Sequence, residues 1–165
     1  NKSIDINPRY YKAYYSLSKL LNDQGDVASS IKSLEKAVEI NPDYEKAYIL
    51  LGVIQSDNSN YVAAIENFNA AITLNNRSYK TYWRLAETYN RFEKYISAKE
   101  SAKESLKIKG NYPGALFELG YSELFMCNKV AAEDAFSKAS KDKNYRKSAK
   151  HYLDNLNQLL AKNCK

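Results

Sequence analysis

Residues 45–78 read EKAYILLGVIQSDNSNYVAAIENFNAAITLNNRS, and the spacing of large and small side chains in this stretch decides the fold. Four of them fall at i, i+3, i+4 and i+7, on one face of a helix: Tyr48, Leu51, Gly52 and Gln55. Residues 64–72 show the same helical spacing. The polar segment 57–60 between them is rich in residues that leave a helix. The stretch therefore predicts two helices joined by a short turn.

The same pattern recurs every 34 residues without an insertion. Three columns mark the register: Leu17, Leu51, Leu85 and Leu119; then Ser18, Gly52, Ala86 and Gly120; and, on the second helix, Leu34, Phe68, Ala102 and Phe136. Small residues let crossing helices approach closely, and large residues opposite them fill the adjoining space. One pair cannot bury its apolar face alone, so neighbouring pairs must stack.

This register predicts an all-α fold with nine main helices. First helices are expected over 12–24, 46–58, 80–92 and 114–126, and second helices over 27–40, 61–74, 95–108 and 129–142. Residues 146–161 break the repeat and place apolar residues on one face, which predicts a single capping helix. The first ten residues are expected to form a short helical remnant.

The motifs Tyr48-x-x-Leu51-Gly52 and Ala64-x-x-x-Phe68 resemble those of the tetratricopeptide repeat family. The resemblance implies a right-handed superhelical α-solenoid of antiparallel helix pairs. It divides the chain into the end of an upstream repeat (1–10), four repeats (11–44, 45–78, 79–112 and 113–146) and a capping helix with a tail (147–165). The departures are Asn76, Gly110 and Asn144 for the terminal Pro, and Ala102 for Phe. The RNA-reading pentatricopeptide family is similar, but its period is one residue longer.

The resemblance implies that the first helices line a concave face. One stripe on each of them is unused by the packing columns, and we expect it to bind a peptide. The predicted binding residues are Lys12, Tyr15, Lys19, Lys46, Ile49, Val53, Lys80, Trp83, Arg84, Glu87, Phe117, Tyr121 and Leu124. Trp83 is the expected anchor, and the lysines spaced by 34 are expected to favour acidic partners. Two alternatives remain open: the lysines are merely solvated, and the aromatic side chains are covered by the terminal helix.

A carboxylate clamp for chaperone C-termini is present only in part. In members of the family that hold such C-termini, the clamp consists of Lys and Asn in the first repeat, Asn in the second, and Lys and Arg in the third. Lys80 and Arg84 match the last two of these positions, but Tyr15, Lys19 and Leu50 occupy the other three. Chaperone binding is therefore not assigned.

Charge and cysteine content exclude several classes of function. The net charge of +6 arises entirely from residues 138–165, since residues 1–137 carry 17 basic and 17 acidic side chains. A general nucleic-acid-binding face is therefore not expected. Cys127 and Cys164 belong to no metal-binding pattern and are expected to be free thiols, and His151 is the only histidine. No phosphate-binding or nucleophile motif occurs, so we expect no catalytic residue, metal or cofactor.

The chain begins inside a repeat, so we expect it to be part of a longer array. Apolar surface around Ile4, Ile6, Tyr14 and Leu21 would then lack a cap, and self-association through this end is expected. No run of apolar residues is long enough to cross a membrane. The cytoplasm is the default expectation for the compartment.

The sequence thus favours a non-enzymatic module that binds a peptide or protein segment in the concave groove. Two alternatives remain open. One is a structural spacer or self-assembly segment of a larger scaffold, and the other is the substrate-selecting arm of an enzyme whose catalytic domain lies outside this chain.

Overall fold

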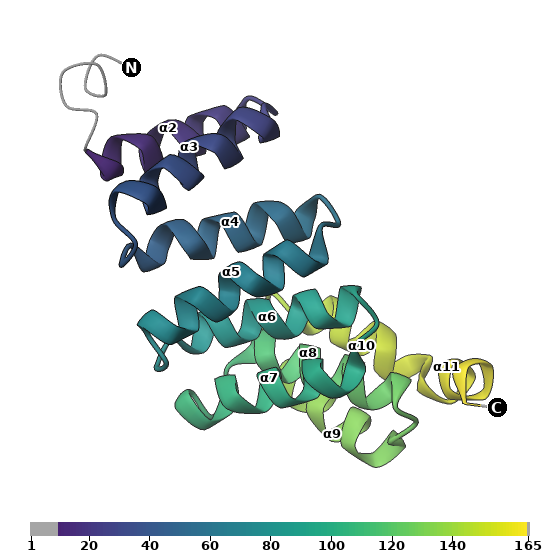
Figure 1. The fold of residues 1–165 in the computed structure, drawn as a ribbon. Helices are drawn as coiled ribbons and strands as arrows, with labels where there is room; N and C mark the ends of the chain where they lie inside the picture. The colour runs from purple at the N-terminus through teal and green to yellow at the C-terminus, as the bar shows by residue number, and fades with distance from the viewer. Residues whose placement is uncertain (1–9, 165) are drawn as a thin grey trace. The chain divides into compact units, whose positions relative to one another are not determined.

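The computed structural model describes residues 10–164, and each 34-residue repeat forms an antiparallel helix pair (Figure 1). The pairs are α2 (Tyr11–Asp23) with α3 (Val27–Ile40), α4 (Glu45–Asp57) with α5 (Tyr61–Leu74), α6 (Tyr79–Arg91) with α7 (Tyr95–Ile108), and α8 (Pro113–Phe125) with α9 (Lys129–Ala139). Two more helices follow, α10 (Arg146–Asp154) and α11 (Leu156–Asn163). Residues 10–164 contain no strand, which confirms the all-α prediction. The helical remnant expected over residues 1–10 lies outside the described part, which begins at Tyr10.

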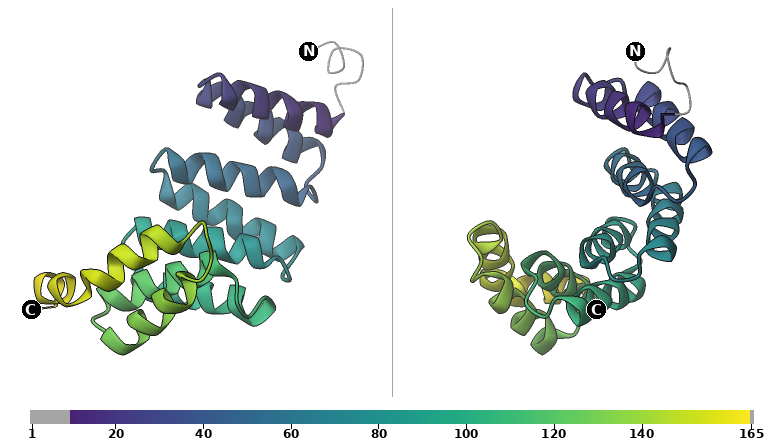
Figure 2. Two further views of the ribbon diagram at one scale, coloured as in Figure 1. Left: turned by 180° about the vertical axis from the view of Figure 1, so that it is seen from behind. Right: turned by 90° about the vertical axis from the view of Figure 1, so that its left-hand side faces the viewer.

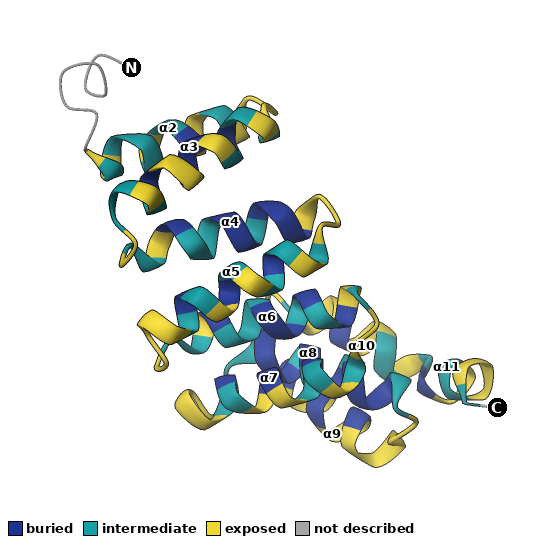
Figure 3. Ribbon diagram, viewed as in Figure 1, coloured by how far each residue is buried: buried dark blue, intermediate teal, exposed yellow. Residues whose placement is uncertain are grey.

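The chain divides into two compact units, residues 1–76 and residues 77–165. The first unit holds α2 to α5, and its core is built from the small and large columns of the repeat. An added Cβ at Gly52 would come within 2.7 Å of the Phe68 ring, so only glycine allows α4 and α5 to approach this closely. Phe68 and Leu34 are both fully buried, and Figure 3 shows buried positions along α3, α4 and α5.

The second unit holds α6 to α11, and its core includes the terminal helices. Gly120 lies against Phe136 as Gly52 lies against Phe68, with an added Cβ only 2.8 Å from the ring. The ring of Phe136 also stacks on that of Tyr152 of α10, with ring centroids 5.0 Å apart. α10 packs on α9, and α11 contacts α8 and α9 (Figure 2). The predicted apolar face of the cap is therefore confirmed.

The turn inside each pair has one residue in the left-handed region of φ. These residues are Gly25, Ser59, Glu93 and Cys127, with φ of 83°, 61°, 59° and 64°. The N–H of the next residue then bonds to the carbonyl five positions earlier, as from Asn128 to Glu123 at 2.8 Å. This is a Schellman-type helix end, which normally uses glycine. Three of the four turns therefore carry a side chain at a position where it is strained.

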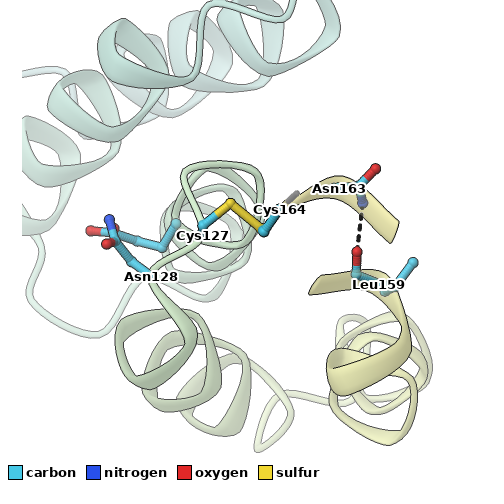
Figure 4. The surroundings of a disulfide bond; sticks show 6 residues. Cys127, Asn128, Leu159, Asn163 and Cys164 are labelled. Atoms are coloured by element: carbon cyan, nitrogen blue, oxygen red, sulfur yellow. Dashed lines mark hydrogen bonds between the residues drawn. A yellow bond between two sulfur atoms is a disulfide. The ribbon is translucent and has the colours of Figure 1, made fainter. Parts of the chain in front are cut away.

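The expectation of free thiols is wrong, because Cys127 and Cys164 form a disulfide (Figure 4). The two residues are 37 positions apart in sequence, but their Cα atoms lie 5.8 Å apart. Cys127 occupies the left-handed position of the α8–α9 turn, and Cys164 follows α11. Because α11 folds back onto α8 and α9, the end of the chain reaches this turn.

The expected single capping helix is also wrong, because the segment breaks at Asn155 into α10 and α11. The Asn155 side-chain amide donates to the carbonyl of His151 at 2.8 Å, beside its own backbone N–H at 3.2 Å. Such a side-chain bond competes with the helical ladder. The break turns the chain so that Leu156 is buried at the start of α11. Likewise, α9 ends at Ala139 rather than at residue 142.

Candidate functional site

In the first unit, the predicted binding residues lie on α2 and α4. Lys12, Lys19 and Lys46 are exposed. Tyr15 is half-buried, and its ring contacts that of Tyr44 edge to face at 5.3 Å. Ile49 and Val53, on α4, are also half-buried. This part of the stripe therefore presents solvated cations beside partly covered apolar side chains.

In the second unit, the predicted binding residues lie on α6 and α8. Lys80 is exposed, and Arg84 forms an ion pair with Glu87 at 2.8 Å. Leu124 is fully buried, so its assignment to a binding surface is wrong. The spacing in the sequence places Leu124 on the stripe, but its side chain belongs to the buried core cluster that includes Phe136.

Trp83 is packed more closely than an exposed anchor would be. Its indole nitrogen is buried without a hydrogen-bond partner and lies against Gly114, where an added Cβ would come within 2.7 Å. The ring of Tyr112 meets the indole edge to face at 5.4 Å, and the Arg84 guanidinium lies 4.2 Å from the ring centroid. Trp83 therefore joins α6 to α8, and its role as a partner anchor stays a prediction.

Three of the predicted residues line one cleft between α6 and α8. Glu87 comes from α6, and Phe117 and Tyr121 come from α8. The cleft has a volume of about 200 Å³, and three further residues complete its lining: Asn90, Arg91 and Glu118. It lies wholly within the second unit.

The floor of this cleft is a hydrogen-bonded pair of buried polar side chains. Asn90 is 4% exposed and Glu118 is 8% exposed. The Asn90 side-chain amide donates to the Glu118 carboxylate at 2.8 Å and to the Glu118 backbone carbonyl at 2.9 Å. Burial raises the pKa of Glu118 to about 7, although the hydrogen bond from Asn90 acts in the opposite direction.

α10 packs against the two aromatic residues of α8 that line the cleft. Tyr152 of α10 meets Phe117 at 5.7 Å and Tyr121 at 5.6 Å, both edge to face. Burial raises the pKa of Tyr121 to about 12. The sequence left open whether the cap covers these aromatic side chains, and the structure shows that it covers them in part. Phe117 and Tyr121 remain half-buried and still line the cleft.

Only one of the two floor residues, Asn90, could be recognised from the sequence. Asn90 falls on the same stripe as Trp83 and Glu87, seven and three positions after them. Glu118 lies one position off the stripe. The equivalent positions hold Ser16, Leu50 and Arg84, of which only the cationic Arg84 was a predicted binding residue, so this column did not predict an acidic residue in the floor. Its place in the floor follows from the packing of α6 against α8.

Two further observations concern other kinds of site. Within residues 10–164, no three or more His, Cys, Asp or Glu side chains are grouped so as to hold a metal ion. Across the same residues, none of the helices has the length and apolar character needed to cross a membrane.

Comparisons with known proteins identify the type of repeat. The model of the family described as the tetratricopeptide repeat protein 21 C-terminal ARM domain matches residues 3–115, so the match ends in α8 just before Phe117. No curated protein matches the chain.

Solved structures give the same fold. A crystal structure of MamA has a TM-score of 0.80 and 24% identity, covering 89% of this chain and 86% of that chain. A mutant O-GlcNAc transferase of Thermobaculum terrenum has a TM-score of 0.69 and 20% identity, covering 79% of this chain and 26% of that one. At these identities the likeness shows the fold alone, which is a helical-repeat solenoid of the tetratricopeptide type.

Proposed function

Because the chain belongs to the family of the tetratricopeptide repeat protein 21 C-terminal ARM domain, we propose that it is a non-enzymatic interaction module that binds a segment of a partner protein at the α6–α8 cleft. The observation that carries this proposal is the cleft itself, where two half-buried aromatic side chains and two charged side chains surround a buried polar floor. Convergent polar groups within an apolar wall are typical of binding sites.

The size of the cleft favours part of a protein over a small molecule. Pockets for drug-sized ligands usually measure about 300–1,000 Å³, and this cleft has about 200 Å³. One side chain of an extended segment fits such a volume, while the rest of the segment would lie on the exposed surface of α6 and α8. Lys80 and Arg91 are exposed on the cleft-bearing helix α6.

Two finer features of the expected partner remain proposals. The exposed lysines Lys12, Lys46 and Lys80 support attraction of acidic residues, but exposed ion pairs are worth only about 0–1 kcal/mol each. Self-association through the N-terminal end also stays a prediction. It rests partly on Ile4 and Ile6, which lie outside the described residues.

Selection from a random-peptide display library, with the whole chain immobilised, tests the proposed site. Glu87→Trp places a bulky ring at the mouth of the cleft, and Glu100→Trp makes the same change on the exposed surface of α7. Thermal unfolding confirms that both variants fold. We expect selected peptides to lose at least tenfold in affinity for Glu87→Trp and to bind Glu100→Trp as they bind the parent. Peptides that bind all three proteins equally, or a selection that yields none, would refute the site and favour a structural spacer.

A further inference from the structure

The orientation of Asn90 leaves a buried acceptor in the floor of the cleft. Its side-chain nitrogen faces two acceptors, the carboxylate and the backbone carbonyl of Glu118, so the nitrogen and oxygen of the amide cannot be exchanged without losing both bonds. The Asn90 side-chain oxygen is buried and has no hydrogen-bond partner. Such an acceptor is costly to leave unpaired, and here it belongs to a residue that lines an open cleft.

Glu118 adds a carboxylate to the same floor. The charged groups nearest to it come from α6: Glu87 makes its ionisation less favourable, and Arg91 and Arg84 make it more favourable. Arg84 is already paired with Glu87. Burial raises the pKa of three nearby tyrosines, and the charge of Glu118 raises it further: Tyr121 on α8, Tyr145 just before α10, and Tyr152 within α10. The floor therefore offers hydrogen-bond acceptors, and the cleft around it is lined by the aromatic rings of Phe117 and Tyr121 and by the charged side chains of Glu87 and Arg91.

A donor with positive charge and an apolar stem complements this arrangement. The volume of about 200 Å³ is several times the share of one water molecule, about 30 Å³. Lys and Arg have aliphatic stems that pack on apolar surface and end in several donors. Phe117 and Tyr121 would cover such a stem, and a cation near their rings is itself attracted to the ring faces.

We infer that the α6–α8 cleft receives one cationic side chain, Lys or Arg, of the partner segment, held by the Glu118 carboxylate and the Asn90 side-chain oxygen. This inference rests on the proposed function and names the chemistry of the residue at its centre. Acidic residues of a partner would interact with the exposed lysines on the solvated surface. The cationic residue inferred here would interact instead with the acceptors in the floor of the cleft.

Binding of a cation here is linked to a proton. With a pKa of about 7, Glu118 is roughly 90% protonated at pH 6 and roughly 90% ionised at pH 8. A cation pairs with the ionised form, so binding at pH 6 releases a proton from Glu118. Affinity for a cation should therefore be about tenfold weaker at pH 6 than at pH 8.

The experiment uses n-butylammonium, which reproduces the lysine side chain, with 1-butanol and butyrate as neutral and anionic probes. NMR of the whole chain follows the Asn90 side-chain amide during each titration. We expect saturable shifts with n-butylammonium only, about tenfold weaker binding at pH 6, and at least tenfold weaker binding in Glu118→Gln, which loses a charge-assisted bond. Glu133→Gln, an exposed change on α9, should bind as the parent does.

Two outcomes would overturn the inference: equal shifts with 1-butanol or butyrate, or unchanged n-butylammonium binding in a folded Glu118→Gln. In either case the proposed function still holds if peptides from the display library bind the Glu87→Trp variant more weakly than the parent. Library peptides that depend on Glu87 but need no Lys or Arg likewise refute only the cationic assignment. Saturable n-butylammonium binding without any such peptide refutes the proposed function instead.

Discussion

Removing the Cys127–Cys164 disulfide should loosen the terminal helices of the second unit and leave the first unit unchanged. The bond connects the α8–α9 turn to the residue after α11, and it encloses a loop 37 positions long. Cys164→Ser removes the bond and keeps Cys127 in its strained turn position. Reduction of the parent by dithiothreitol is the same perturbation without a mutation.

The size of the effect follows from the loop. Loop-closure entropy for about 37 residues corresponds to roughly 4 kcal/mol at 25 °C, and native disulfides typically contribute about 2–4 kcal/mol. The cap is also held by Ala149 and Leu156, which are buried in the core cluster of the second unit. These contacts persist without the disulfide, so we expect local opening of α10 and α11 rather than loss of the fold.

Native-state hydrogen exchange measures this opening helix by helix. A loss of about 2–4 kcal/mol means that amides of α11 exchange roughly thirtyfold to a thousandfold faster, since about 1.4 kcal/mol corresponds to tenfold. Amides of α4 serve as the internal control and should keep their protection. Thiol titration of the unfolded, unreduced protein first establishes that the bond is present.

Two results would refute this reasoning. Two free thiols in protein kept from reductants would mean that the disulfide does not form. Equal protection of α11 in the parent, the reduced protein and Cys164→Ser would mean that packing alone holds the cap.

Three other predictions concern single residues. Because burial holds the pKa of Glu118 near 7 in the folded state, against 4.5 normally, the folded state retains a proton that the unfolded state loses. Stability should therefore fall by roughly 3 kcal/mol between pH 4.5 and 7, and urea unfolding of Glu118→Gln should lack this fall; an equal slope in both proteins would contradict it. Gly120→Ala should destabilise the second unit by about 1–3 kcal/mol in the same assay, because the new methyl meets Phe136 at 2.8 Å, and an unchanged midpoint would show that the helices separate at little cost. Glu93→Gly should raise stability by about 1 kcal/mol, because φ of 59° suits glycine; lower thermal stability would show that the glutamate side chain contributes more than the strain costs.

The helix pairs and their cores could be predicted from the sequence. A 34-residue register is a local pattern, and it specifies which residues face the partner helix of the same pair. Gly52 against Phe68 and Gly120 against Phe136 are contacts between neighbouring helices, separated by one short turn. The positions of these residues in the repeat are therefore enough to predict the contacts within each helix pair.

The disulfide, the broken cap and the floor of the cleft were decided by tertiary structure. Cys127 and Cys164 meet only because α11 turns at Asn155 and returns to the α8–α9 turn. Glu118 lies off the repeat stripe and is buried because α6 and α8 pack together, so its raised pKa and its bond to Asn90 depend on residues 28 positions apart. Periodicity determines which side of its own helix a residue occupies, but burial and charge depend on everything that packs against that side.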